Sequence, residues 1–247
     1  MGRLAKFFLF LGLLCLIQIA SRAEFRILAF GDSNTWGWKP DGSGQRFSDA
    51  ERWTGVLQER LGEGFIVSTD GLVARRTNLD GLDAGLVEGF FLNGAKSLPA
   101  ALARHAPLNL LILFLGTNDV QAGAERSAQE VADAVGALVK LATGADSLLY
   151  SSYPAPPEVW VIVPPPLGDL RGTPLEGLFS PGIEASQQFA KAFGGLSKRA
   201  EVRIFDFESL GETPTGADGI HLTLPAHRFL GESLARALVS ESVESEK

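Results

Sequence analysis

The sequence predicts a protein of the α/β class, with three layers in which helices cover both faces of a five-stranded parallel sheet. Short apolar segments alternate with stretches whose apolar residues have helical spacing. This alternation is typical of consecutive strand–helix–strand units. No internal repeat or low-complexity linker interrupts residues 24–247, so we expect them to form one domain.

Five apolar segments are the candidate strands. They span residues 25–30, 65–69, 108–115, 159–163 and 202–207. The third is nearly all Leu, Ile and Phe, as expected of a central parallel strand that is covered on both faces.

The helices are predicted from periodicity and from their end signals. Trp53, Val56, Leu57 and Leu61 recur at helical spacing before the stop signal Gly62. A capping box of Ser127 and Glu130 precedes apolar residues on one helical face, and leucines 230, 234 and 238 indicate a C-terminal helix. Segments 39–50, 75–95 and 164–181 do not fit the alternation. Loops of that length are more often functional than idle, and we expect them to border one site.

The N-terminus has the pattern of a cleaved signal peptide. Arg3 and Lys6 precede the apolar run 7–20, and Ser21-Arg22-Ala23 supplies small residues at a cleavage site. The run is shorter than the ~20 residues that span a membrane. We therefore expect residues 1–23 to be removed near Ala23 and the mature protein to be periplasmic or secreted, without stable membrane insertion afterwards. A retained N-terminal anchor is the alternative.

Composition excludes several classes of partner and chemistry. Cys15 is the only cysteine, so the chain after Ala23 has no disulfide, catalytic thiol or cysteine metal ligand. Loss of residues 1–23, with three basic and no acidic residues, changes the formal net charge from −7 to −10. No basic stripe is present, which argues against a nucleic-acid partner. A homo-oligomer remains open.

Three short blocks place candidate catalytic residues after predicted strands. They are residues 31–33 (Gly-Asp-Ser), 116–119 (Gly-Thr-Asn-Asp) and 218–221 (Asp-Gly-Ile-His). Folds of this class place their chemistry at strand ends. A histidine activates a serine hydroxyl by removing its proton, and an aspartate fixes the histidine tautomer. We expect Ser33, His221 and Asp218 in these roles, unless Ser33 only caps the following helix.

The middle block offers a hydrogen-bond donor. The Asn118 side-chain amide could stabilise an oxyanion, although an ordinary turn asparagine is the alternative. The other two histidines, His105 and His227, are more plausibly structural or surface groups, since neither has an acid placed as Asp218 is for His221.

At this point the sequence resembles a known family, the SGNH (GDSL-type) hydrolases, whose conserved blocks I, III and V are similar to the three blocks above. Further segments resemble the arylesterase/acyltransferase branch of that family: residues 31–38 (GDSNTWGW), 52–55 (RWTG), 92–94 (LNG), 153–156 (YPAP) and 164–167 (PPPL). The resemblance covers nearly all of residues 24–247. It implies the SGNH hydrolase fold, with a parallel sheet in flavodoxin-like order.

The resemblance also implies the roles of site residues. Ser33 would be the nucleophile, His221 the general base and Asp218 its orienting acid. The oxyanion hole would combine the Ser33 amide, the Asn118 side chain and the backbone amide of Ala74. Two positions depart from the family pattern: Asn34 stands where the family name has leucine, and Ala74 stands where the second block usually has glycine.

The implied function is hydrolysis of short-chain aryl or alkyl esters through an acyl-enzyme, with acyl transfer to alcohols or peroxide as a further capacity. The small-molecule ester would meet an apolar rim on the motif loops, formed by Trp36, Trp38, Phe47, Leu167, Leu178 and Phe179. We expect no cofactor and no metal, because three histidines are too few for the ligand set of a metal-dependent phosphoesterase. A non-catalytic carbohydrate- or surface-binding protein on the same fold is the alternative.

Overall fold

The structure is a computed structural model that describes residues 24–81, 88–124, 126–144, 155–198, 202–206 and 214–244. The expected signal peptide, residues 1–23, lies outside the described residues. Tyr153 and Phe207, the ends of two predicted segments, lie outside them as well.

Five parallel strands form one sheet in the order β2-β1-β3-β4-β5, the flavodoxin-like order that the sequence predicts. The strands are β1 (Phe25–Gly31), β2 (Phe65–Gly71), β3 (Leu110–Phe114), β4 (Glu158–Ile162) and β5 (Arg203–Phe205). Each coincides with one of the five apolar segments. β1 lies between β2 and β3, and every pairing is parallel.

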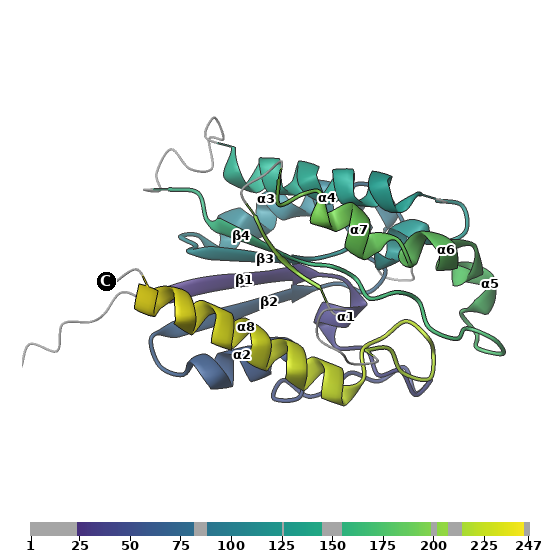
Figure 1. The fold of residues 1–247 in the computed structure, drawn as a ribbon, viewed down its shortest axis with the longest axis horizontal. Helices are drawn as coiled ribbons and strands as arrows, with labels where there is room; N and C mark the ends of the chain where they lie inside the picture. Colours follow the sequence, from purple (N-terminus) through teal and green to yellow (C-terminus); the bar gives the residue numbers. More distant parts are fainter. Residues whose placement is uncertain are drawn as a thin grey trace, which may run out of the picture.

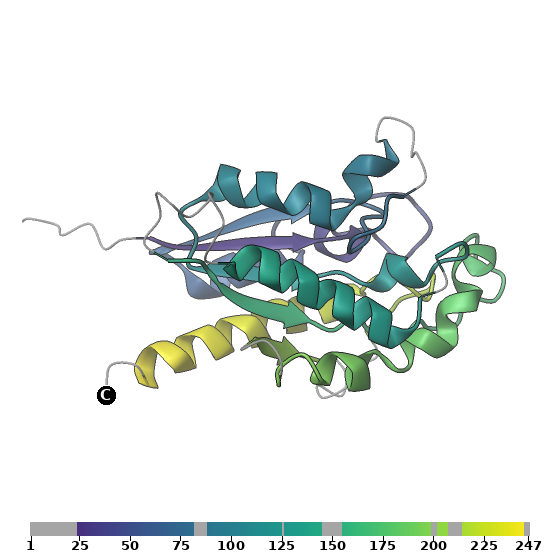
Figure 2. The ribbon, with the colours of Figure 1, turned by 90° about the horizontal axis from the view of Figure 1, so that it is seen from above.

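Helices cover both faces of the sheet. Figure 1 shows α2 (Trp53–Leu61) and α8 (Leu224–Glu244) together below it. On the other face lie α3 (Gly94–His105), α4 (Ala128–Thr143) and α7 (Phe189–Gly194), and the view from above in Figure 2 shows α3 beside α4. The protein therefore has the predicted α/β/α layers.

The two layers of core are built by the period-two alternation of strand residues. Leu28 and Phe30 of β1 face the α4 side, whereas Ile27 and Ala29 face the α2–α8 side. All residues of β3 are buried, which agrees with its position at the centre of the sheet.

The predicted helix signals are confirmed at α2, α4 and α8. In α4, the Ser127 hydroxyl accepts from the Glu130 N–H while the Glu130 carboxylate accepts from the Ser127 N–H, which completes the capping box. Segment 164–181 differs from the expectation of a loop. It contains the short helix α5 (Glu176–Phe179), and the buried side chains of Leu167 and Phe179 join the core.

The remaining short helices lie beyond the carboxyl ends of the strands, at the right of Figure 1. They are α1 (Ser33–Trp36), η2 (Thr117–Val120), η4 (Ser180–Gly182) and α6 (Ile183–Ser186), while η1 (Gly89–Leu92) precedes α3. The described short helices of segments 75–95 and 164–181 thus lie at the same end of the sheet as α1 and η2. Within the described residues, no helix is long and apolar enough to cross a membrane.

Candidate active site

The turn between β1 and α1 presents Ser33. Asp32 is the N-cap of α1, because its Oδ1 accepts from the Asn34 N–H at 2.9 Å. Asp32 and not Ser33 therefore caps the helix. At Gly31 an added Cβ would clash with the Thr35 side chain of α1 and would lie 2.7 Å from the Phe114 carbonyl oxygen, so glycine lets both α1 and β3 approach β1 closely.

Ser33, His221 and Asp218 form a continuous chain of hydrogen bonds. Ser33 Oγ lies 2.9 Å from His221 Nε2, and His221 Nδ1 lies 2.6 Å from Asp218 Oδ2. All three side chains are buried. The structure thus brings together three residues from the two ends of the sequence, in the order that the sequence analysis expects.

The charge of Asp218 fixes the direction of these hydrogen bonds. Burial pushes the pKa of Asp218 upward, but its hydrogen bond to His221 and the histidine charge outweigh this and leave the pKa below its usual value. An ionised carboxylate only accepts, so His221 Nδ1 carries the proton that it donates to Asp218. His221 Nε2 is then the acceptor, and the Ser33 hydroxyl donates to it.

The turn that carries Asp218 and His221 is held by its own backbone. Asp218 Oδ1 accepts from the Ile220 and His221 N–H groups at 3.0 and 2.9 Å. Gly219 has φ +72°, a left-handed conformation that suits glycine, and a Cβ there would lie 2.8 Å from the Asp169 carbonyl oxygen. The glycine lets segment 164–181 pack directly against this turn.

Aromatic residues from the expected rim take two different positions. Trp38 stacks on the His221 ring, with centroids 5.6 Å apart, and Trp36 lies beside Trp38. Phe47 instead packs edge-on against the His227 ring. Of the six expected rim residues, Leu167 and Phe179 are core residues, as noted above. The structure therefore places Trp38, and not the whole set, next to the catalytic candidates.

His227 has a structural position. Its Nδ1 accepts from the Trp53 N–H at 3.3 Å, at the start of α2, where the N-cap residue makes no side-chain cap. Burial, aided by the charges of Arg52 and His221, lowers the pKa of His227 to about 3. The ring is therefore neutral near pH 7 and links α8 to α2.

Three hydrogen-bond donors lie at the ends of the neighbouring strands β2, β1 and β3. Asn118 follows β3, and Ser33 and Ala74 follow β1 and β2. Within the described residues, the backbone N–H groups of Ser33 and Ala74 donate to no acceptor of the protein. Ala74 has φ +64°, which is uncommon for a residue other than glycine.

The loops after β2 and β3 are joined by Asp119. Its buried carboxylate accepts from the Thr77 N–H at 3.0 Å and from the Thr77 hydroxyl, and Arg126 lies within 3.2 Å. Burial raises the pKa of Asp119, against the lowering effect of these contacts. Asp119 therefore supports the loops of the site, as its position in the block suggests.

Three polar residues at this site make hydrogen bonds that sequence reasoning did not predict. Asn34 Oδ1 accepts from the Leu222 N–H at 2.9 Å and thereby ties the first block to the last. Gln121 donates to Asn118, and Arg76 donates to Gln121. Only the nearness of each residue to a block signals a role, because Leu222 is 188 residues from Asn34 and Gln121 is 45 residues from Arg76.

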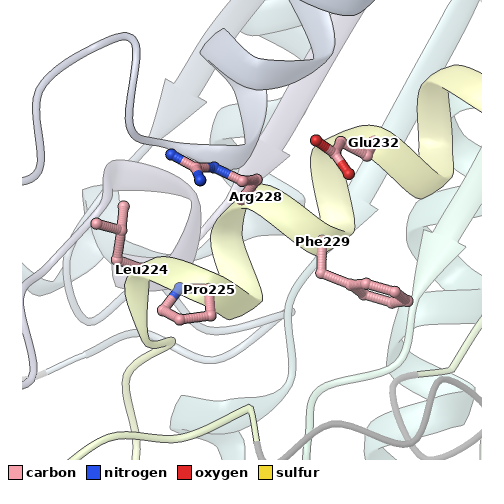
Figure 3. A pocket seen from close by; sticks show the side chains of 5 residues that line it. All are labelled: Leu224, Pro225, Arg228, Phe229 and Glu232. Carbon is pink, nitrogen blue, oxygen red and sulfur yellow. The ribbon is translucent and has the colours of Figure 1, made fainter.

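A metal centre and a surface pocket are two other kinds of site to consider. Among the described residues, no group of three or more His, Cys, Asp or Glu side chains is arranged to hold a metal ion. A surface pocket of about 300 Å³ lies on α8, and Figure 3 shows the side chains that line it: Leu224, Pro225, Arg228, Phe229 and Glu232. None of the three hydrogen-bonded residues of the site lines this pocket.

The fold and the hydrogen-bonded Ser33, His221 and Asp218 define the class: an α/β/α serine hydrolase that acts on ester bonds. The chain belongs to the GDSL-like lipase/acylhydrolase family, whose model matches residues 29–229. The family resemblance expected from the sequence is thereby confirmed.

Solved structures agree with this assignment. An aryl esterase from M. smegmatis is 38% identical, with a TM-score of 0.78 over 87% of this chain and 99% of its own. A carbohydrate acetylesterase from Sinorhizobium meliloti is 34% identical, with a TM-score of 0.79 over 88% and 99% of the two chains. A second carbohydrate acetylesterase family member from that organism is 30% identical, with a TM-score of 0.78 over 87% and 97%. The comparison with curated proteins found no match.

Proposed function

We propose that the protein hydrolyses short-chain acyl esters of aryl or simple alkyl alcohols, with Ser33 as the nucleophile. The observation that carries this proposal is the chain from Ser33 Oγ through His221 to Asp218, beside three donors at the ends of adjacent strands. The name of the carbohydrate acetylesterase structure supports a small acyl group, and the name of the aryl esterase structure supports an aryl alcohol.

The proposed reaction has two halves. The Ser33 oxygen attacks the ester carbonyl while its proton moves to His221 Nε2, and the carbonyl oxygen becomes an oxyanion. Collapse of this intermediate expels the alcohol, which takes the proton from His221 Nε2, and leaves an acyl group on Ser33. Water then attacks the acyl-enzyme by the same route and releases the acid and free Ser33.

The oxyanion is stabilised, in this proposal, by the Ser33 and Ala74 N–H groups and by Asn118 Nδ2. A single donor of this kind accounts for about 10²–10³ in kcat in a well-studied protease. Asp218 holds the imidazole in the tautomer that accepts from serine and stabilises the imidazolium that forms. Trp38, stacked on the His221 ring, limits the ring's movement and forms an apolar wall beside the scissile ester.

Acyl transfer requires no further residue. An alcohol or peroxide that reaches the acyl-enzyme ahead of water accepts the acyl group through the same His221 proton transfer. The half-buried Trp36 and Trp38 at the site favour an apolar acceptor over water.

Removal of residues 1–23 in a periplasmic or secreted location also belongs to this proposal.

The test compares p-nitrophenyl acetate, butyrate and octanoate as substrates of wild type and Ser33→Ala. We expect wild-type kcat/KM to fall with chain length, and Ser33→Ala to lose turnover while its thermal unfolding stays like that of wild type. Equal rates in both proteins would contradict the nucleophile, and a preference for octanoate would contradict the substrate class. Adding benzyl alcohol and measuring benzyl acetate against acetate gives the partition between transfer and hydrolysis.

A further inference from the structure

Asn118 is the end of a chain of three buried polar side chains. Arg76 Nη2 donates to Gln121 Oε1 at 3.0 Å, and Gln121 Nε2 donates to Asn118 Oδ1 at 2.7 Å. All three side chains are at least nine-tenths buried. They connect the loop after β2 with the segment after β3, where the proposed oxyanion donors lie.

The two ends of this chain fix the orientation of both amides. The Arg76 guanidinium can only donate, so the Gln121 atom that meets it must be the carbonyl oxygen. The amide nitrogen of Gln121 then faces Asn118, whose contacting atom must in turn be Oδ1. At the far end, Asn118 Nδ2 donates to the Arg75 carbonyl oxygen at 3.1 Å, and a carbonyl oxygen can only accept. Every contact therefore agrees with one orientation alone.

The orientation leaves a donor of Asn118 available. One hydrogen of Asn118 Nδ2 is used on the Arg75 carbonyl, while the other has only a long contact, 3.5 Å, with Asp32 Oδ2. An amide turned over by 180° would place Oδ1 in this position, and an oxygen there would repel a developing oxyanion. The rate of ester cleavage then depends on which way the amide points.

The Arg76 side chain is itself held in place. Its Nη1 donates to the Asp80 carbonyl oxygen at 3.3 Å. Its backbone N–H donates to the Leu92 carbonyl at 2.8 Å, and its carbonyl accepts from the Gly94 N–H at 3.0 Å. The guanidinium is thus a fixed positive charge at the start of the chain, and hydrogen bonds in series polarise one another in a low-dielectric interior.

We propose that Arg76 and Gln121 are positioning residues that hold the Asn118 amide with its nitrogen toward the reacting carbonyl and strengthen it as a donor. This inference rests on the proposed function, because it requires Asn118 to stabilise the oxyanion. Neither residue touches the substrate in this proposal, so their loss lowers kcat and leaves KM nearly unchanged.

The central experiment is a double-mutant cycle between Gln121→Glu and Asn118→Ala, measured as kcat for p-nitrophenyl acetate. The introduced carboxylate accepts from Arg76 but cannot donate to Asn118, so the Asn118 amide loses its fixed orientation. We expect Asn118→Ala to lower kcat by about 10²–10³. We expect Gln121→Glu to approach that loss, and the double variant to be no slower than Asn118→Ala alone.

Two further readouts separate positioning from a merely structural role. The kcat of Gln121→Glu relative to wild type should rise as the pH is lowered, because a protonated carboxyl can donate to Asn118 Oδ1 again. Arg76→Lys, which keeps a donor, should retain more kcat than Arg76→Met.

The matched control is Gln129→Glu on the exposed face of α4, which should leave kcat unchanged. Gln121→Met provides an uncharged second variant, also expected to lower kcat, if Gln121→Glu fails to fold.

The outcomes are distinguishable. The inference would be overturned if the two losses of kcat multiplied in the double variant. It would also be overturned if folded Gln121→Glu or Gln121→Met kept the wild-type kcat. Either result would leave the proposed function intact. A wild-type kcat in Asn118→Ala would show that Asn118 is not an oxyanion donor, which removes both that part of the proposed function and this inference.

Discussion

Two aspartates beside Ser33 have pKa values shifted in opposite directions. Asp218 is held below its usual pKa by His221 despite partial burial. Asp32 is fully buried, and desolvation raises its pKa to about 6 against the lowering effects of its hydrogen bond from Asn34 and of nearby positive charge. Residues of one type thus differ in pKa through burial and partners, a pattern typical of active sites.

Substitution of Asp218 tests its proposed role with little change in shape. In Asp218→Asn, an amide oxygen can still accept from the Ile220 and His221 N–H groups, so we expect the melting temperature to stay close to wild type. The histidine loses the acceptor that fixes its tautomer, and kcat should fall by about 10⁴. The measurement is p-nitrophenyl acetate turnover beside thermal unfolding. A folded variant within tenfold of wild type would show that Asp218 is not the orienting acid.

Asp32 makes stability depend on pH. Its pKa is about 6 in the folded protein against 3.8 as the unperturbed value, so the folded state binds more protons between these pH values. The free energy of unfolding therefore falls as pH rises through this window, by about 3 kcal/mol for this group. Asp32→Asn removes the titration. Its stability relative to wild type should increase from pH 4 to pH 7 in urea unfolding.

Parallel stability curves for wild type and Asp32→Asn across that range would contradict the raised pKa. Activity is a separate readout of the same variant. The introduced amide can present only one oxygen to the two donors, the Asn34 N–H and Asn118 Nδ2, and we expect kcat to fall even where the protein is more stable.

At the scale of elements, the loop after β2 is the least regular part of the site. Residues 71–77 carry Ala74 at φ +64°, and the Arg75 guanidinium donates to the carbonyl oxygens of Gly31 and Asp70. The arginine thus ties the loop to the ends of β1 and β2. This clamp holds Ala74 in a conformation that is costly for an L-residue.

Replacing Ala74 tests that conformation. Ala74→Gly should raise the free energy of unfolding by about 1 kcal/mol, because glycine adopts positive φ without a steric penalty. Its kcat should be preserved, since glycine keeps the backbone N–H. Ala74→Val should lose stability, because a β-branched residue tolerates this conformation least. Urea unfolding of the three proteins measures both effects. A loss of stability in Ala74→Gly would contradict a left-handed residue at this position.

The elements differ in how far the sequence predicts them. Apolar runs ending at turn residues predict all five strands, since a buried parallel strand leaves a strong local signal. The short helix α5 is not predicted, because its four residues, Glu176–Phe179, are too few to show a helical period. Ser33, Asp218 and His221 come from short blocks, whereas the contact of Arg76 with Gln121 depends on the fold of two distant loops. Local patterns do not contain such contacts.

At the scale of the whole molecule, the sheet and both core layers lie within residues 25–244. β1 pairs with β2 and β3 from Phe25 and Ile27 onward, and the two apolar layers are built from strands and helices of this range. The family model likewise matches within it. Every residue to which we assign a role in the proposed chemistry therefore lies after residue 23.

A protein of residues 24–247 should accordingly match the full-length chain. We expect the same kcat/KM for p-nitrophenyl acetate and the same melting temperature, because no described contact of the site requires an earlier residue. The two proteins are compared at equal concentration in the same buffer. Loss of folding or activity in the shorter protein would mean that residues 1–23 belong to the functional domain and are not a removable signal.

The most direct test of the central claim, that His221 activates Ser33 as a nucleophile, is covalent labelling. The protein is incubated with a p-nitrophenyl phosphonate ester, which reacts with activated serines, and the adduct is located by peptide mass spectrometry. The account predicts one phosphonyl group per chain, on Ser33, with loss of esterase activity at the same rate, and no labelling of His221→Ala. Labelling elsewhere, or full activity without a label on Ser33, would contradict it.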